Sequence, residues 1–136
     1  MENPFTARPT FVAHTGIELT DASPDHAVGH LDIEPEHHQP YGVVHGGVYS
    51  TLIETLASTG AALWAMENGL AGAMGVSNTT DFLKATTEGR LIGVAKPIHR
   101  GRTQQLWEVE VRNEGDDRLV AHGQVRLQNV SKTEFQ

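Results

Sequence analysis

One stretch of this sequence has the apolar spacing of a long helix, and shorter stretches on both sides of it alternate apolar and polar residues. Apolar residues recur every three or four positions from Val48 to Leu63, and the stretch ends at Asn68-Gly69, a pair that commonly stops a helix. We therefore predict a helix from Gly47 to about Asn68. An antiparallel sheet must cover its apolar face, and this helix is the one long element available to cover it.

Alternation with a period of two predicts the strands of that sheet. The clearest case lies near the C-terminus, where Ala121, Val125 and Leu127 alternate with polar residues. The predicted strands are residues 17–22, 26–33, 73–82, 90–98, 103–112 and 119–127. The prediction is an α+β fold in which an antiparallel sheet wraps around one central helix. We expect residues 1–136 to form a single domain, with 1–12 as a poorly ordered lead and 131–136 as a tail.

Composition excludes several function classes. The 136 residues can form one core but are few for an enclosed pocket built by a single chain, and the absence of cysteine excludes disulfides, thiolate metal sites and a cysteine nucleophile. The net charge of -7 argues against nucleic acid as a partner. No long uncharged apolar run and no signal-peptide pattern is present, so we expect a cytoplasmic protein without a membrane partner.

The start of the predicted helix offers groups for chemistry. Gly46 and Gly47 allow a ligand to approach backbone N–H groups that have no partner within a helix, which suits developing negative charge. Further along, Glu54 stands among apolar and small residues. An isolated glutamate at a helix edge usually faces water, but Ser58 lies one turn away and can orient the carboxylate. In a partly dry site Glu54 would be a nucleophile or a general base.

The spacing of these groups predicts a shared site. Seven residues of helix rise ~10 Å, so the glycine pair and Glu54 of one chain are too far apart to contact the same carbonyl group. Two antiparallel copies of the helix would bring the start of one beside Glu54 of the other. We therefore expect a two-fold dimer with the site between its subunits.

Three histidines near this helix raise the possibility of a metal site. His37, His38 and His45 are close in sequence, but neither their spacing nor a carboxylate partner matches a usual ligand set such as His-Glu-x-x-His. We expect no metal, and we interpret His45 as a pocket residue beside the helix start.

The basic residues are unevenly distributed. No lysine or arginine lies between Arg8 and Lys84, and five of the ten then fall in one segment: Lys84, Arg90, Lys96, Arg100 and Arg102. Some of these could simply be solvated strand residues. The functional interpretation is a local phosphate-binding patch, for which arginine is well suited.

Several motifs resemble one family along nearly the whole chain. They are His-Gln-Pro-Tyr-Gly-Val-Val-His-Gly-Gly at residues 38–47, Glu54 nine residues after His45, the Pro-Ile-His-Arg-Gly-Arg turn at 97–102, and Trp107-Glu108. The chain resembles hotdog-fold acyl-CoA thioesterases of the phenylacetate-degradation (PaaI-like) type. Within these it is most similar to the subgroup of the enterobactin proofreading thioesterase and the 1,4-dihydroxy-2-naphthoyl-CoA thioesterase.

The resemblance implies a role for each matching residue. Glu54 would be the catalytic carboxylate, Gln39 and the Gly46 N–H would polarise the thioester oxygen, His45 would lie near the sulfur, and Ser58 would orient the carboxylate or water. Substrate and CoA contacts would come from Gly47, Phe82, Arg90, His99, Arg100 and Arg102. The substrate would be an acyl-CoA or a carrier-protein thioester, with CoA as part of the substrate and no separate cofactor. The assembly would be at least a homodimer, and we expect a homotetramer.

One segment departs from this subgroup. After the helix, the subgroup has a histidine pair and Arg-Pro, whereas this chain has Asp-Phe-Leu-Lys-Ala at residues 81–85. The change argues against a hydroxyaryl substrate and favours an aliphatic or less substituted aromatic acyl group. Two alternatives stay open at this stage: a hotdog dehydratase or hydratase of 3-hydroxyacyl thioesters that pairs His45 with Glu54, and a non-catalytic acyl-CoA binding protein.

Overall fold

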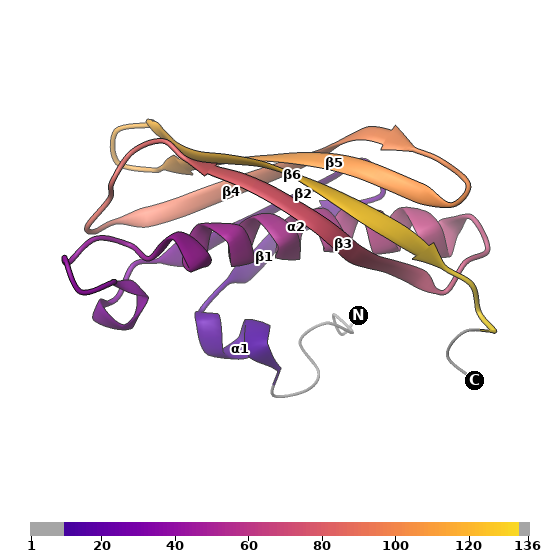
Figure 1. The fold of residues 1–136 in the computed structure, drawn as a ribbon, viewed down its shortest axis with the longest axis horizontal. Helices are drawn as coiled ribbons and strands as arrows, with labels where there is room; N and C mark the ends of the chain where they lie inside the picture. Colours follow the sequence, from indigo (N-terminus) through magenta and orange to yellow (C-terminus); the bar gives the residue numbers. More distant parts are fainter. Residues whose placement is uncertain (1–9, 134–136) are drawn as a thin grey trace.

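A six-stranded antiparallel sheet curves over one long helix in the computed structural model, which describes residues 10–133 (Figure 1). The helices are α1 (Phe11–Thr15), the short 3-10 turn η1 (Pro35–His37) and α2 (Gly46–Glu67). The strands are β1 (Glu18–Ser23), β2 (His26–Asp32), β3 (Gly72–Phe82), β4 (Arg90–Arg100), β5 (Gln104–Asn113) and β6 (Leu119–Val130). The predicted α+β fold, its long helix and its six strands are confirmed.

The sheet has the order β1-β2-β4-β5-β6-β3, so that β1 and β3 are its edges. Two strands run further than predicted. β4 continues past Pro97: Pro97 pairs with Trp107 of β5, a register shift leaves Ile98 without a partner, and the pairing resumes at His99 opposite Leu106. β6 continues to Val130 because its last residues pair with the start of β3, where Gly72 lies opposite Val130.

Helix α2 packs into the concave face of the sheet through contacts that require glycine. Gly29 and Gly93 lie opposite each other on β2 and β4, and a Cβ atom built on either would come within 2.8 Å of a Leu56 methyl carbon. On β5, the buried Trp107 ring occupies the space where Gly60 of α2 has no side chain. These contacts fix the position of α2 along the sheet, and with it the direction of its opposite face.

Both ends of α2 are capped. The helix ends at the predicted stop, Asn68-Gly69. The imidazole of His45 caps the first turn, and Gly69 has the left-handed φ of +80° typical of a helix end. Leu70 N–H then donates to the Ala65 carbonyl at 2.9 Å, which satisfies one of the last carbonyls. Among the described residues, no helix combines the length and the apolar character needed to cross a membrane.

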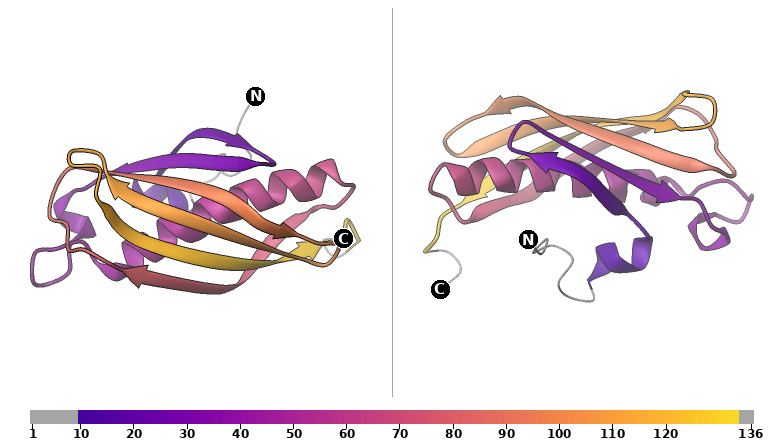
Figure 2. Two further views of the ribbon diagram at one scale, coloured as in Figure 1. Left: turned by 90° about the horizontal axis from the view of Figure 1, so that it is seen from above. Right: turned by 180° about the vertical axis from the view of Figure 1, so that it is seen from behind.

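Helix α1 lies on the side of α2 away from the sheet (Figures 1 and 2). It ends at Gly16, which has a φ of +84°, and β1 follows directly. Most of the predicted lead, residues 1–9, lies outside the described residues, whereas Phe11 and Val12 belong to α1. Of the predicted tail, residues 134–136 lie outside as well.

Candidate active site

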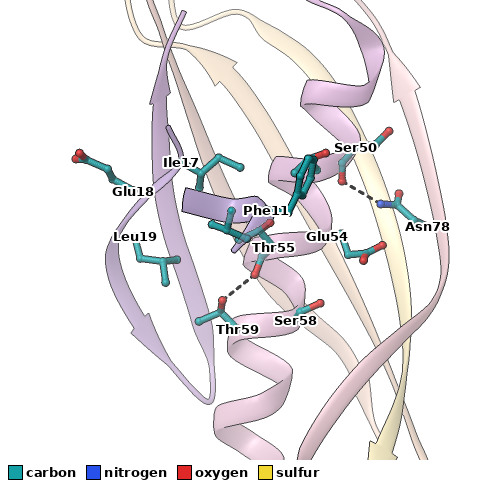
Figure 3. Close-up of a pocket in the computed structure, with 12 residues that line it drawn as sticks. Phe11, Ile17, Glu18, Leu19, Ser50, Glu54, Thr55, Ser58, Thr59 and Asn78 are labelled. Atoms are coloured by element: carbon teal, nitrogen blue, oxygen red, sulfur yellow. Dashed lines mark hydrogen bonds between the residues drawn. The ribbon is translucent and has the colours of Figure 1, made fainter. Parts of the chain in front are cut away.

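A groove of about 680 Å³ runs along the face of α2 that points away from the sheet (Figure 3). Helix α1 and strand β1 border it on one side, and Asn78 of β3 borders it on the other. Its lining residues are Phe11, Val12, Ile17, Glu18, Leu19, Ser50, Thr51, Glu54, Thr55, Ser58, Thr59 and Asn78. Two predicted catalytic residues, Glu54 and Ser58, therefore share one groove.

The carboxyl group of Glu54 lies against the backbone of β3. A Cβ atom built on Gly75 would be 3.3 Å from Glu54 Cδ, so the missing side chain at 75 makes room for the carboxylate. Beside it, Asn78 Nδ2 donates to the Ser50 carbonyl at 3.0 Å and ties β3 to α2. Within one chain Glu54 is exposed, and in the described part of the molecule Ser58 does not hydrogen-bond to it. Residues 10–133 of one protomer therefore do not give this carboxylate a dry environment.

At the start of α2, the backbone donors are partly occupied. His45 Nδ1 accepts from Gly47 N–H at 2.8 Å, and the His45 carbonyl accepts from Val48 N–H at 2.9 Å. Gly46 N–H makes no hydrogen bond to residues 10–133. Because Nδ1 accepts, the neutral imidazole of His45 carries its proton on Nε2. The first turn thus presents two donors to a ligand, Gly46 N–H and His45 Nε2–H.

Gln39 lies in the turn that precedes this helix. Its carbonyl accepts from Gly42 N–H at 2.9 Å, Gly42 has a φ of +81°, and the side-chain oxygen of Gln39 accepts from Tyr41 N–H. With that oxygen engaged, the carboxamide can offer its N–H groups to a ligand.

Phe82 covers the helix start from the end of β3. Its ring would be 2.5 Å from a Cβ atom built on Gly46, and its centroid lies 5.9 Å from that of the Tyr49 ring. Phe82 therefore supplies an apolar surface beside the Gly46 N–H group.

The two groups of predicted catalytic residues lie apart within one protomer. Gly46 and Glu54 are eight residues apart on a continuous helix, which corresponds to ~12 Å of rise. His45 and Glu54 likewise do not face each other within the chain, so the pair that the dehydratase alternative requires could form only between two protomers.

The histidines considered for a metal site have structural contacts. His37 is 7% exposed; its Nδ1 accepts from Glu34 N–H at 2.9 Å and its Nε2 donates to the Thr15 carbonyl at 2.6 Å. His38 Nε2 donates to the Thr87 carbonyl at 2.8 Å. Within residues 10–133 no cluster of three or more histidine and acidic side chains has the arrangement of a metal site.

The basic segment does not form a single patch within one protomer. Arg90 and Arg100 lie at opposite ends of β4, roughly 33 Å apart at 3.3 Å per residue. Arg90 forms a double hydrogen bond with Asp32 at 2.7 and 3.2 Å, which lowers the pKa of the Asp32 carboxyl and raises the pKa of Arg90. The expectation of one local patch that includes Arg90 is therefore wrong for the single chain.

Two of the other basic residues, Arg100 and Arg102, lie at the β4–β5 turn. Arg100 donates to the Pro24 carbonyl and the Asp25 carboxylate at 2.7 and 2.8 Å, and its guanidinium lies 5.9 Å from the centroid of the Trp64 ring. It therefore holds the β1–β2 turn. Arg102 and His99 are exposed and lie beside it.

Sequence reasoning missed one wall of the groove. Phe11, Val12, Ile17 and Leu19 face Glu54 across α2, and they come from α1 and β1, to which we assigned no chemistry. The only available signal was the apolar pair Phe11-Val12 next to a predicted strand. Asn78 was missed as well, because its role depends on β3 lying against α2.

Comparisons with known proteins agree with the fold. The family described as the thioesterase superfamily matches residues 41–125. A Mycobacterium tuberculosis protein named "Putative esterase Rv1847" is 44% identical over 128 residues, which cover 93% of this chain and 91% of that protein. Its solved structure has a TM-score of 0.86 and 45% identity, with 89% of this chain and 96% of that chain covered.

Two further proteins extend the comparison. The crystal structure of AziG from S. sahachiroi has a TM-score of 0.84 and 41% identity, and covers 90% of this chain and 97% of that one. The proofreading thioesterase EntH of Cronobacter turicensis is 32% identical over 105 residues, which cover 77% of this chain and 75% of that protein. The chain therefore belongs to the thioesterase superfamily, and it is a hotdog-fold thioester hydrolase.

Proposed function

We propose that this protein hydrolyses acyl-CoA thioesters to a free acid and CoA, with a carrier-protein thioester as the alternative substrate. In the proposed site, Glu54 of one protomer acts on the thioester carbonyl while Gly46 N–H and Gln39 of its partner bind the carbonyl oxygen. The observation that carries the proposal is the position of Glu54. Its carboxylate lies in an open groove against Gly75, near the start of β3, while Gly46 of the same helix lies against Phe82, at the end of β3.

The edge strand β3 supports a dimer. A long unprotected edge offers unpaired backbone groups to another strand, and natural edges are usually blunted by lysine, proline or inward charges. β3 has 11 residues, contains neither lysine nor proline, and exposes Met74 and Val76, each at 57%. A second copy of β3 is the partner that a two-fold axis would supply.

The register of such a pairing would join the two halves of the site. Glu54 lies against Gly75, whereas Gly46 lies under the ring of Phe82, seven residues along the same strand. If β3 pairs antiparallel with its copy so that Gly75 faces the partner's Phe82, residues 75–82 of both strands are paired. Each Glu54 then comes beside the partner's helix start.

The chemistry follows from these positions. In one route, Glu54 removes a proton from water as the water oxygen bonds to the thioester carbon; in the other, the Glu54 carboxylate attacks that carbon itself. In both routes, negative charge moves to the carbonyl oxygen, where the partner's Gly46 N–H and Gln39 stabilise it. The C–S bond then breaks. In the water route, the proton that Glu54 took from water passes to the CoA sulfur, which leaves as a thiol. In the covalent route, water then hydrolyses the acyl–Glu54 anhydride to the free acid, and the proton released goes to the CoA thiolate. His45 Nε2–H is the donor next to the expected position of the sulfur, and Ser58 lies one turn from Glu54 to orient the water.

Residues at the β4–β5 turn would bind the CoA phosphates. Arg102 and His99 are exposed there, and Arg100 is anchored by Asp25 and stiffens the same turn. Arg90 lies too far away to bind the same phosphate group within one protomer, so any contact from it would come from another subunit. Gly47 and Phe82 would contact the pantetheine or acyl part near the helix start.

Thiol release from acyl-CoA tests this proposal. Glu54→Gln should lower kcat by about 10²–10⁴-fold because it removes the base or nucleophile, while CoA binding measured by calorimetry stays close to wild type. Glu67→Gln changes an exposed glutamate near the other end of α2 and should leave turnover unchanged. Turnover near wild type in Glu54→Gln would remove Glu54 from the mechanism, and release of no thiol from any acyl-CoA by the wild type would overturn the proposed substrate.

A further inference from the structure

A second apolar cavity lies next to the groove that holds Glu54. Its volume is about 410 Å³, and it extends under α1 toward Leu31, Val48 and the helix start. The two cavities share three lining residues: Phe11, Ile17 and Thr51. Ile17 is buried in the core, whereas Phe11 is 68% exposed and its ring stands over α2 (Figure 3). Phe11 is therefore the movable side chain at the border between the two cavities.

The charges along the main groove restrict what can enter it. Among residues 10–133, its charged lining residues are Glu54 and Glu18, and no lysine, arginine or histidine of this range lines it. Glu18 lies 3.2 Å from His30 Nε2, so that it already has one partner outside the groove. An acyl group with its own carboxylate or phenolate would lie near the Glu54 carboxylate and, within residues 10–133, would find no cation in the groove, which is unfavourable in a partly desolvated site.

The wall that carries Phe11 is anchored rather than loose. The buried His37 donates from Nε2 to the Thr15 carbonyl in the last turn of α1, while its Nδ1 accepts from Glu34 N–H. Thr15 Oγ1 donates to the Val12 carbonyl at 2.6 Å and closes the single turn. α1 thus has a defined position over α2 although none of its own residues is buried.

We propose that the groove between α1, β1 and α2 takes an uncharged, apolar acyl group, and that Phe11 sets how long this group can be. The proposal rests on the proposed function, since it assumes that Glu54 meets the thioester carbon. From that point an acyl chain lies between Thr55 and the side chains of Leu19, Ile17 and Phe11. A chain that reaches the Phe11 ring stops there, with the second cavity behind it.

The test is a chain-length profile of kcat/KM for thiol release. Saturated acyl-CoAs from four to fourteen carbons are compared in the wild type, Phe11→Ala and Phe11→Trp. Each methylene that enters an apolar cavity raises kcat/KM several-fold, so Phe11→Ala should move the optimum by two or more carbons toward longer chains. Phe11→Trp should move it toward shorter chains. Met66→Ala, an exposed apolar residue of α2 outside both cavities, should keep the wild-type optimum.

A matched pair of substrates tests the charge argument. Hexanoyl-CoA and adipoyl-CoA have the same number of acyl carbons, but the second ends in a carboxylate, and we expect at least tenfold lower kcat/KM for it in the wild type. An unchanged optimum in both Phe11 variants, or equal rates for the two substrates, would overturn the inference while the thioesterase proposal stands. Absence of thiol release from every acyl-CoA would instead overturn the proposed function itself.

Discussion

The contact between Gly46 and Phe82 shows how a missing side chain shapes the proposed oxyanion site. A Cβ atom on residue 46 would come within 2.6 Å of two Phe82 ring carbons, yet this ring is 57% exposed and can swing outward. The glycine therefore matters for where the aromatic ring lies more than for whether the chain folds.

Gly46→Ala should lower kcat/KM at least tenfold while the melting temperature stays within a few degrees of wild type, because the methyl group displaces the Phe82 ring. In Gly46→Ala/Phe82→Ala the clash is gone, and we expect activity close to that of Phe82→Ala alone. This non-additivity, measured as a double-mutant cycle on kcat/KM, is typical of residues in contact. Additive losses would mean that the two residues act independently.

Tyr49 carries an unusual hydroxyl group. The residue is 2% exposed, and its Oη is buried without a hydrogen-bond partner in the described part of the chain. Burial raises the pKa of the Tyr49 phenol, and Thr86 opposes this shift to a lesser degree. A phenol whose pKa is higher in the folded than in the unfolded state stabilises the fold at low pH, and this contribution is lost as pH rises beyond the unfolded value of about 10.

Tyr49→Phe should therefore be as stable as wild type at pH 7, or more stable by up to about 1 kcal/mol, because it removes an unsatisfied polar group. Between pH 9 and 11 its melting temperature should fall less steeply than that of the wild type. Thermal unfolding followed by circular dichroism across this range measures both effects. A large loss of stability at pH 7 would show that the hydroxyl has a partner in the assembled protein.

At the scale of secondary structure, one of the tight contacts joins α2 to β5. A Cβ atom on Gly60 would be 2.5 Å from a carbon of the Trp107 ring, which is fully buried and also hydrogen-bonded through Nε1 to Gln105 Oε1 at 2.8 Å. Unlike Phe82, this ring has nowhere to move. The helix and the strand must therefore separate if residue 60 gains a side chain.

Gly60→Ala should destabilise the protein by about 1–3 kcal/mol through overpacking, which corresponds to a drop of several degrees in melting temperature. Gly115→Ala is the control, since its nearest neighbour would be at 3.4 Å, an ordinary contact. If both variants have the melting temperature of the wild type, the packing of α2 on Trp107 is looser than the structure indicates.

Secondary structure also explains why the helices and strands could be predicted from the sequence and parts of the candidate site could not. Strands with one buried face repeat every second residue, as at Trp107, Val109 and Val111, so β5 could be placed from the sequence. The groove could not, because its second wall comes from α1, a five-residue helix with no apolar period. The arginines of β4 were grouped wrongly because an extended strand carries residues ten positions apart to opposite ends of the sheet.

For the whole molecule, the central prediction is that each active site combines groups from two protomers. Glu54→Gln and Gln39→Ala should each be nearly inactive alone. After the two variants are mixed and their subunits exchanged, half of the dimers are mixed and each mixed dimer has one intact site, so about a quarter of wild-type activity should return. Each variant mixed with itself is the control. No recovery after confirmed exchange would place Glu54 and Gln39 of one site on the same protomer.

The self-association through β3 can be tested separately. Val76→Lys places a charge on the exposed edge, which should shift the dimer toward monomer and abolish turnover together with it. Light scattering gives the mass, and it also shows whether wild-type dimers pair into the expected tetramer. Gln124→Lys changes an exposed residue of β6, a strand that already pairs with β3 on one side and β5 on the other, and it should change neither property.

The two opposed glycines on β2 and β4 have a consequence for how this enzyme can evolve. Leu56 follows Glu54 by two residues and therefore points to the opposite side of α2, where Gly29 and Gly93 receive it. A methyl group added at Gly29 or Gly93 would rotate α2 or displace it from the sheet, and this would move the Glu54 carboxylate. The direction in which the Glu54 side chain points thus depends on Gly29 and Gly93, which lie on the side of α2 opposite the groove. Substitutions at these two positions would alter catalysis although neither residue lines the proposed site.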